Sequence, residues 1–243
     1  LICSSLIKVF ARQDPDQQLI AVLANSLATV LNPYEITDTN ALQNCSLATT
    51  KLGELAASGN LVGAALDTDA LIADSISALL ETKLVSPSNY EGIQGNFTSV
   101  FSDLEDGIHK GLVSGMYRSI VNKNIRMSVL NQPQESLAYA VLMPPATESE
   151  TQTDAPRPML ILPSTGLQAC GFVDSARASI TQWGVDPYNT GSNLRTPSFR
   201  LKTAHDLMSD VVPEDFPEPF TIVLQYSNAQ DWSVNEPGCS YIT

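Results

Sequence analysis

Basic residues are scarce in this chain, and it has no long apolar run. Its 13 Lys and Arg stand against 26 Asp and Glu, which gives a formal net charge of −13. A surface of this sign repels nucleic acid phosphates and anionic lipids, so we expect no nucleic acid partner. No stretch approaches the roughly 20 apolar residues that span a bilayer. We therefore expect contact with a membrane only through segments outside this chain.

The sequence also lacks the signatures of common enzymes and cofactor sites. It contains no GxSxG motif, no CxxC pair and no Gly-rich phosphate loop. Its two histidines, His109 and His205, have no companion motif, and we interpret both as surface or boundary residues. The acidic stretch 209–219 has three prolines and lacks the spacing of a calcium loop. We predict a non-enzymatic chain without a cofactor, with calcium binding at this stretch as the alternative.

Cysteines are few, but their number is even. Cys3 and Cys45 lie in the first half of the chain, and Cys170 and Cys239 lie in the second. Their spacing disfavours zinc, and we predict two disulfides, Cys3 with Cys45 and Cys170 with Cys239. Buried free thiols are the alternative.

Two sequons suggest passage through the secretory route. Asn44-Cys45-Ser46 and Asn96-Phe97-Thr98 match the acceptor pattern for N-glycosylation. The chain begins at Leu1, and its first residues lack the basic start and the cleavage site of a signal peptide. We expect an internal fragment of a longer protein on the extracellular side of the plasma or ciliary membrane.

The first half of the chain has helical periodicity. Apolar residues recur every three or four positions in four segments, each bounded by Asn, Asp, Ser, Gly or Pro. The spacing predicts helices over residues 17–32, 39–58, 67–83 and 101–116. We expect them to pack as an all-helical subdomain that occupies residues 1–121.

The period changes from 3.6 to 2 at Asn124. Short alternating or apolar runs follow over 125–129, 136–145, 158–163 and 220–226, and each predicts a strand. The polar, Pro-flanked stretch 145–158 between two of these runs is typical of a mobile loop. We predict an α+β fold in which an antiparallel β-sandwich occupies residues 122–243.

Several motifs of the second half occur in a recognisable order. They are "GMYRSIVNKNIRMSVL", "FVDSARASITQWGVDPYN", "LRTPSFRLK" and "PEPFTIVLQY". The series resembles the GAIN domain of polycystin-1-like and receptor-for-egg-jelly proteins and, more distantly, that of adhesion receptors. "NKNIRMSV" looks like the first sandwich strand of that family, and "PFTIVLQY" is similar to the strand before its cysteine-rich proteolysis motif.

The resemblance gives the stretch "QWGVDPYN" a structural role. It looks like the Trp and Asn-Pro-aromatic turn of the family, although Asp186 stands where the family more often has Asn. We expect Trp183 to cap a hydrophobic layer, Asp186 and Pro187 to make the turn, and Tyr188 to pack back on the sheet.

Self-cleavage is the reaction that the resemblance implies. In cleaving members, a His-Leu-Thr or His-Leu-Ser tripeptide supplies the base and the nucleophile. These 243 residues contain neither tripeptide, so none of them is assigned to that reaction. "PGCSYIT", at residues 237–243, resembles the start of the cleavage motif, and Cys239 would then pair with a cysteine beyond Thr243.

Together these features predict an extracellular juxtamembrane module of a polycystin-1-like cell-surface protein. It would hold a downstream segment of the same protein without a covalent peptide link, and would contact other cell-surface or matrix glycoproteins. The second hypothesis is a secreted or matrix adhesin subunit without a membrane anchor. The third is an esterase-like hydrolase, for which the sequence offers no nucleophile.

Overall fold

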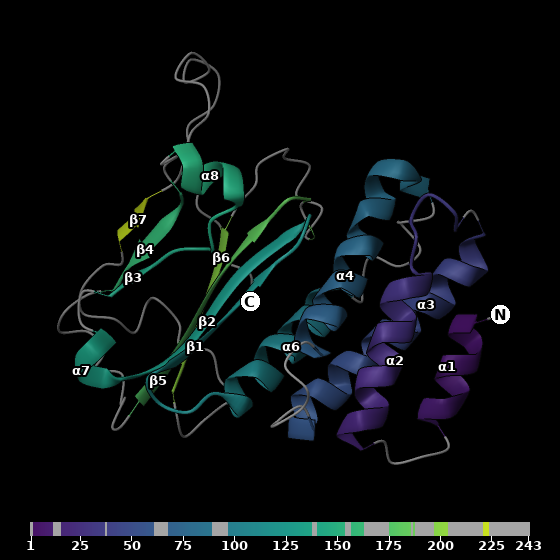
Figure 1. The fold of residues 1–243 in the computed structure, drawn as a ribbon, viewed down its shortest axis with the longest axis horizontal. Helices are drawn as coiled ribbons and strands as arrows, with labels where there is room; N and C mark the ends of the chain where they lie inside the picture. The colour runs from purple at the N-terminus through teal and green to yellow at the C-terminus, as the bar shows by residue number, and fades with distance from the viewer. Residues whose placement is uncertain are drawn as a thin grey trace.

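The computed structural model shows an α+β protein in which most helices precede the strands (Figure 1). The structure describes residues 2–11, 16–36, 38–60, 68–88, 97–137, 140–153, 157–162, 175–185, 187, 197–203 and 221–223. The helical part contains α1 (Ile2–Phe10), α2 (Gln17–Val30), α3 (Thr39–Leu55), the π-helical turn η1 (Ala56–Asn60), α4 (Thr68–Val85) and α6 (Phe97–Gly111). The remaining elements are β1 (Met116–Val121), β2 (Ile125–Pro133), α7 (Gln134–Leu137), β3 (Val141–Leu142), α8 (Glu148–Thr153), β4 (Met159–Ile161), β5 (Ser175–Trp183), β6 (Pro197–Thr203) and β7 (Thr221–Val223).

The four predicted helices are confirmed as α2, α3, α4 and α6. Local chemistry sets two of their starts: Asp16 accepts a hydrogen bond from the Leu19 amide at 2.8 Å, and Asp38 accepts one from the Ala41 amide at 2.9 Å. Each carboxylate therefore satisfies an amide that has no partner within its helix. Helix α1 was not predicted, because its nine residues span too few turns to show a clear period.

The helical part ends earlier than the sequence predicted. Helix α6 ends at Gly111, and Met116, which the spacing placed on the helix, begins β1 instead. Leu112 and Met116 extend the apolar spacing, but the helix stops at Gly111, and Gly115 adopts a left-handed backbone (φ +87°) that a continuing helix could not contain. A boundary at residue 121 therefore falls inside the antiparallel β1–β2 hairpin.

The strands form two antiparallel sheets. One has the order β1-β2-β5-β6, and the other has the order β3-β4-β7. The predicted mobile loop over 145–158 is wrong in part, since it contains α8. The amide of Glu150 donates to the Thr147 hydroxyl at 3.3 Å, and the Thr147 amide donates to the Glu150 carboxylate at 3.0 Å. This reciprocal capping is a helix-start signal within an otherwise loop-like composition.

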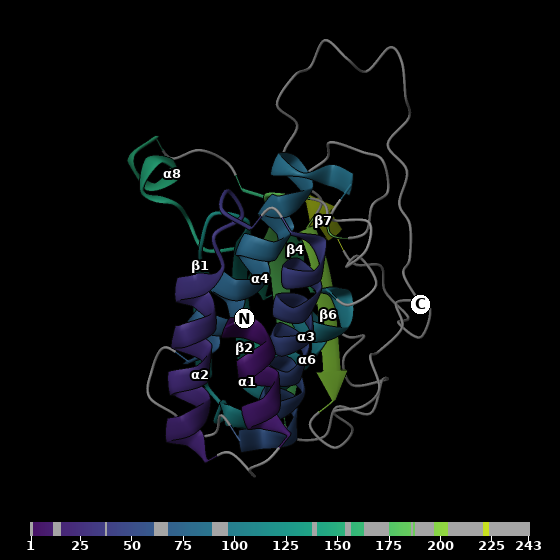
Figure 2. The same cartoon turned by 90° about the vertical axis from the view of Figure 1, so that its right-hand side faces the viewer.

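One hydrophobic core joins the helices to the four-stranded sheet. Buried residues of α2, α3, α4 and α6 share a single cluster with Ile125, Met127 and Val129 of β2 and with Trp183 of β5. Figure 1 shows the helices on one side of the strands, with α4 and α6 nearest the sheet, and in Figure 2 the helical side faces the viewer in front of the strands. The helical part and this sheet consequently share one packing unit.

A second cluster covers the opposite face of the same sheet. Ala176, Ala178 and Ile180 of β5 pack there with Leu142 of β3 and Leu160 of β4. The alternate residues of β5 belong to the helix-facing side. The central part of the four-stranded sheet thus lies between the helices and the smaller sheet, while most side chains of the edge strand β1 are exposed.

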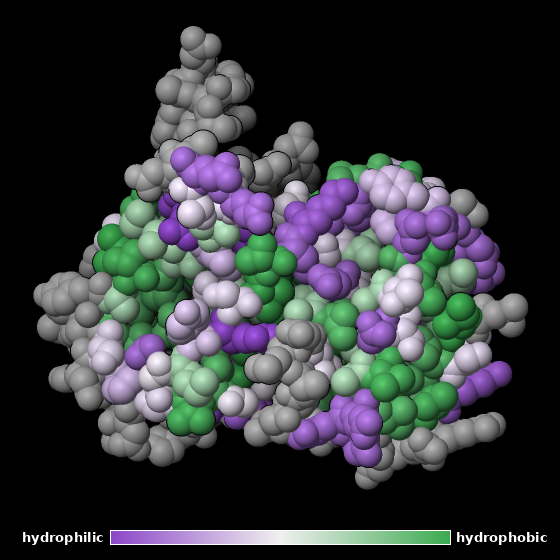
Figure 3. All heavy atoms as spheres, in the orientation of Figure 1, coloured by the Kyte–Doolittle hydropathy of each residue, from purple (hydrophilic) through white to green (hydrophobic). Residues whose placement is uncertain are grey.

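Several large apolar side chains remain at the surface, intermixed with polar ones (Figure 3). The most exposed are Tyr117, Val113, Leu84 and Tyr34, at 63% to 72% exposure. Scattered exposure of this kind is usual in folded proteins. Among the described helices, none combines the length and the apolar character needed to pass through a membrane.

Substitution of Gly107 by alanine is expected to destabilise the helical layer. An added Cβ would lie 2.6 Å from the Ala56 carbonyl oxygen, so α6 and η1 would have to move apart. We expect Gly107→Ala to lower the free energy of unfolding by about 1–3 kcal/mol in urea denaturation. Gly111→Ala is the matched control, because its Cβ meets no atom within 4 Å. Equal stability of the two variants would contradict the close approach.

Candidate functional site

Residues from distant parts of the chain meet where α4 and α6 contact the four-stranded sheet. We call this set of contacts the junction. Its members are Ser77, Phe101, Glu105, Asn124, Ser179, Trp183, Gly184 and Arg200.

The turn between β1 and β2 begins the junction. The Asn122 side-chain oxygen accepts hydrogen bonds from the amides of Asn124 at 3.2 Å and Ile125 at 2.8 Å. The Asn122 amide donates to the Ile125 carbonyl at 2.9 Å. Asparagine suits this role because its short side chain can bond the backbone two or three residues further on. The turn is therefore held rigidly by its own sequence.

Asn124 connects this turn to α4 and to the end of β5. Its side-chain amide donates to the Ser77 carbonyl at 2.9 Å, and its backbone amide lies 3.3 Å from the Ser77 hydroxyl oxygen. The Gly184 amide donates to the Asn124 carbonyl at 2.8 Å. A Cβ on Gly184 would lie 3.0 Å from both the Asn124 Cα and the Lys123 carbonyl oxygen, so a glycine permits this approach. Asn124 itself is 3% exposed.

Trp183 fills the core beside this contact. Its ring meets Phe101 of α6 edge to face, with centroids 4.4 Å apart and planes at 62°. The indole nitrogen donates to the Ser198 hydroxyl of β6 at 3.2 Å, so the polar atom of the buried ring is satisfied. Pro187 is also buried, whereas Asp186 and Tyr188 lie outside the described residues.

A buried carboxylate links α6 to two strands. Glu105 is 2% exposed; it accepts a hydrogen bond from Ser179 of β5 at 2.7 Å and one from Arg200 of β6 at 2.8 Å. Burial raises the pKa of Glu105 above its ordinary value, although Arg200 and Ser179 oppose the change. Arg200 also lies 3.8 Å from Asp106, so one cation faces two carboxylates. The cation thus compensates a charge that the helix brings into the core.

Further ionic contacts connect the rim of α4 to β1 and to the turn. Arg118 of β1 donates to both carboxylate oxygens of Asp69, at 2.7 and 2.6 Å. Glu81 accepts from Lys123 and, at 2.7 Å, from Tyr34. Hydrogen bonds from Lys123 and Tyr34 lower the pKa of Glu81. Helix α4 is therefore attached to the sheet along several turns.

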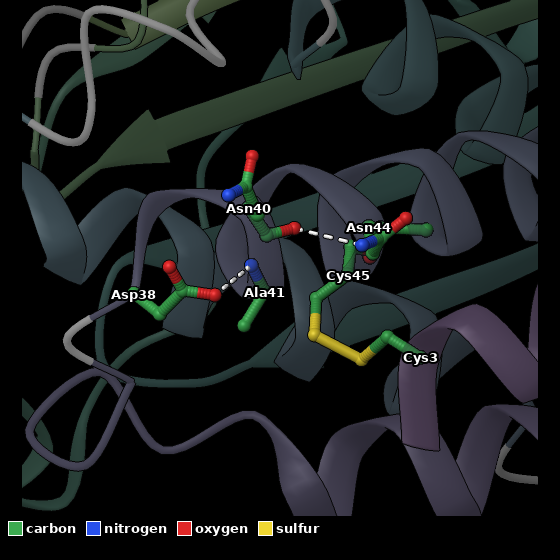
Figure 4. Close-up of a disulfide and its surroundings, with 7 residues drawn as sticks. Cys3, Asp38, Asn40, Ala41, Asn44 and Cys45 are labelled. Carbon is green, nitrogen blue, oxygen red and sulfur yellow. Dashed lines mark hydrogen bonds between the residues drawn. A yellow bond between two sulfur atoms is a disulfide. The ribbon is translucent and has the colours of Figure 1, made fainter. Parts of the chain in front are cut away.

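A disulfide closes the far side of the helical layer. Cys3 of α1 and Cys45 of α3 are bonded, with their Cα atoms 4.9 Å apart, which confirms the first predicted pair (Figure 4). Crosslinks over a separation of 42 residues contribute about 4 kcal/mol in the chain-entropy model. Cys170 and Cys239, the second predicted pair, lie outside the described residues.

The remaining predicted sites have mixed outcomes. Asn44 lies half-buried on α3, and Asn96 lies outside the described residues, as does His205. The interpretation of His109 as a surface or boundary residue is wrong, because it is 1% exposed on α6. Gly107, Ile108 and His109 are buried in succession, so the last turn of α6 is covered on more than one side. No group of three or more potential metal ligands occurs within the ranges that the structure describes.

Neither a protein-family model nor a curated protein sequence matches the chain. The resemblance to GAIN domains consequently rests on the motifs in the sequence.

The ionic part of the junction was missed by sequence reasoning. Glu105 follows Phe101 by four residues, which places its carboxylate on the apolar stripe of α6. A charged residue at such a position needs a partner from another element, and this was the available signal. The identity of that partner depends on strand pairing, because Arg200 stands opposite Ser179 in the β5–β6 register.

Loss of the Asn124 side chain is expected to weaken the attachment of the sheet to α4. Asn124→Ala removes a buried hydrogen bond to Ser77, so we expect the free energy of unfolding to fall by about 1–3 kcal/mol. Asn25→Ala, at an exposed position of α2, is the control and should be neutral or slightly stabilising. Urea denaturation followed by circular dichroism measures both. A neutral Asn124→Ala would mean that this hydrogen bond does not hold the junction.

Replacement of Arg200 should produce a stability loss that depends on pH. Arg200→Met leaves Glu105 buried without its cation, which costs about 3 kcal/mol where the carboxylate is ionised. The folded-state pKa of Glu105, already raised above 4.5 by burial, should rise further in the variant. Folded protein then takes up a proton that unfolded protein does not, so stability increases as pH falls through that raised pKa.

The loss of stability in Arg200→Met, relative to wild type, should be largest near pH 8 and should become smaller as the pH is lowered toward 4.5. Lys51→Met removes the same charge from the exposed pair with Glu54 and should cost less than about 1 kcal/mol. Thermal unfolding of the three proteins between these pH values measures the effect. A deficit that is independent of pH would show that ionised Glu105 is not its source.

Proposed function

We propose that this chain is a GAIN-like juxtamembrane module of a polycystin-1-like cell-surface protein. It lies on the extracellular side of the plasma or ciliary membrane and performs no catalysis with its own residues. Its work is mechanical and adhesive, because it holds a downstream segment of the same protein.

One observation carries this proposal. Two motifs that the resemblance depends on, "NKNIRMSV" and "QWGVDPYN", lie some sixty positions apart in the sequence, and they meet through the 2.8 Å hydrogen bond from Gly184 to Asn124. The same asparagine binds Ser77 in the helical layer. These motifs therefore serve a shared structural purpose, which supports the family resemblance.

The layers suit a module that resists force. A force applied to the sheet is transmitted to α4 through the hydrogen bond of Asn124 and to α6 through that of Glu105. The disulfide then joins α1 to α3 behind them. Breaking this path requires the loss of buried contacts together, since the helices and the sheet share one core.

We also propose that the two sheets form the sandwich of that family. The second cluster packs Leu142 and Leu160 of the smaller sheet against Ala178 and Leu201 of the larger one. In such a sandwich, a strand from beyond Thr243 would be held by backbone hydrogen bonds and by apolar burial.

A secreted or matrix adhesin is the second candidate, and the net charge of −13 favours it. An acidic surface of this size suits association with basic or calcium-bridged glycoproteins. The two candidates differ in the segment that they require after Thr243: a membrane span in the full-length protein supports the first, and its absence supports the second.

Mass spectrometry of the native full-length protein tests the proposal, before and after denaturation and with deglycosylation. We expect a separate polypeptide that begins shortly after Thr243 and stays attached until denaturation. Asn124→Ala should release that polypeptide at lower denaturant concentration, while Asn25→Ala should behave as wild type. One continuous chain would reduce the module to an uncleaved spacer or adhesion domain. If Asn124→Ala releases the polypeptide at the same denaturant concentration as wild type, the junction does not contribute to holding that polypeptide.

A further inference from the structure

The Asn44 sequon is built around a residue of the disulfide. Its middle residue is Cys45, bonded to Cys3, and its third residue is Ser46, which is 2% exposed. All three residues lie inside α3. A transferase reads the hydroxyl of the third residue together with the asparagine amide. In the folded protein that hydroxyl is buried, so the transferase cannot bind the sequon once α3 has packed.

The disulfide can form before the rest of the chain after Cys45 is made. Cys3 precedes the sequon, so both thiols are present as soon as residue 45 has entered the oxidising compartment. Glycosylation of Asn44 and closure of the disulfide therefore compete for the same short stretch of unfolded chain.

The folded protein nevertheless has room for a sugar at Asn44. A cavity of about 270 Å³ lies beside it and is lined by Ile2, Cys3, Val30, Ile36, Ala41, Asn44 and Cys45. Its lining residues are apolar apart from Asn44, and Ile2 among them is 56% exposed, so the pocket offers an open apolar floor. The C–H face of a hexosamine ring suits such a floor.

The asparagine can also keep its own hydrogen bond. Its amide nitrogen donates to the Asn40 carbonyl at 2.8 Å (Figure 4). Attachment of a sugar replaces one of the two amide hydrogens and leaves the other to donate. A glycan added before folding is thus compatible with the final helix.

We propose that Asn44 accepts an N-linked glycan only while Cys3 and Cys45 are still reduced, and that the first sugar then covers the cavity beside the disulfide. This inference rests on the secretory route of the proposed function. It does not depend on whether the module holds a downstream segment.

Two covalent steps are in competition. In the first, the Asn44 amide nitrogen bonds to the anomeric carbon of an oligosaccharide and loses a proton, while the bond from that carbon to a lipid pyrophosphate carrier breaks. The pyrophosphate leaves with the electron pair. In the second, the thiols of Cys3 and Cys45 lose two protons and two electrons to a disulfide oxidant, which becomes a dithiol. The second step removes the substrate of the first.

The test measures glycan occupancy at Asn44 in the full-length protein made by secretory cells. Peptides are deglycosylated in heavy-oxygen water and analysed by mass spectrometry. Cys3→Ser leaves the sequon intact but prevents the disulfide, and we expect it to raise occupancy several-fold over wild type. Cys45→Ser, which turns the sequon into Asn-Ser-Ser, should do the same. Because the glycan is attached before the chain folds, the occupancy of Asn44 can be measured even if a cysteine variant later misfolds.

Two controls come from the chain itself. The Asn96 sequon contains no cysteine, so its occupancy should be equal in wild type and in both cysteine variants. Ser46→Ala removes the Asn44 sequon and should abolish that glycan while keeping the disulfide. The Ser46 hydroxyl has no hydrogen-bond partner within the described part of the chain, so its removal leaves the helix intact.

Equal occupancy of Asn44 in wild type and in both cysteine variants would overturn the competition, as would full occupancy in wild type. Absence of glycan from Asn44 in all three, with Asn96 occupied, would overturn the site. Absence from both asparagines would overturn the secretory route, and the proposed function with it. A single continuous chain after Thr243 would leave the glycan result unaffected.

Discussion

The arrangement of this protein depends on burying both faces of one antiparallel sheet. In β5 the residues alternate between two environments: Ser179 and Trp183 meet α6, while Ala178 and Ile180 meet the smaller sheet. A strand buried on both sides leaves its polar side chains little access to water, so a partner from a neighbouring layer stabilises them. Ser179 of β5 finds such a partner in Glu105, whereas the Thr181 hydroxyl has none within the described residues. This requirement explains why the helix–sheet contact is rich in hydrogen bonds instead of being purely apolar.

At the junction, one amide and one carboxylate supply such partners. The Asn124 side chain donates to the Ser77 carbonyl of α4, and the Asn124 carbonyl accepts from the Gly184 amide after β5. An apolar side chain at this position could not make the bond to α4. Glu105 performs the same task for α6, at the cost of a buried charge that Arg200 compensates. Satisfied buried polar groups favour a single geometry, because any slip of the layers leaves them unpaired. The mechanical role that we propose would require such a defined register.

The sequence anticipated the elements with strong local signals. Helices α2, α3, α4 and α6 have apolar residues at helical spacing, and the even distribution of the cysteines predicted the Cys3–Cys45 pair. Weak or conflicting local signals caused the errors. Helix α1 is too short for a clear period, β1 follows a helix whose spacing it continues, and α8 begins with a capping pair inside a polar stretch. His109 was misplaced because its burial, at 1% exposure, depends on the tertiary packing around the end of α6 and not on the local pattern of apolar residues.

The sequence by itself determined the class of the fold and the positions of its strongest helices, because periodicity and caps act over a few residues. The turn at Asn122 is also local, because the Asn122 side-chain oxygen accepts a hydrogen bond from the Asn124 amide, although the sequence pattern indicated only a change of period at Asn124. Only the tertiary structure decided that Asn124 meets Ser77 and Gly184, and that Glu105 meets Arg200. These contacts join positions separated by 47 to 95 residues, and their pairing depends on how the layers stack and on the strand register.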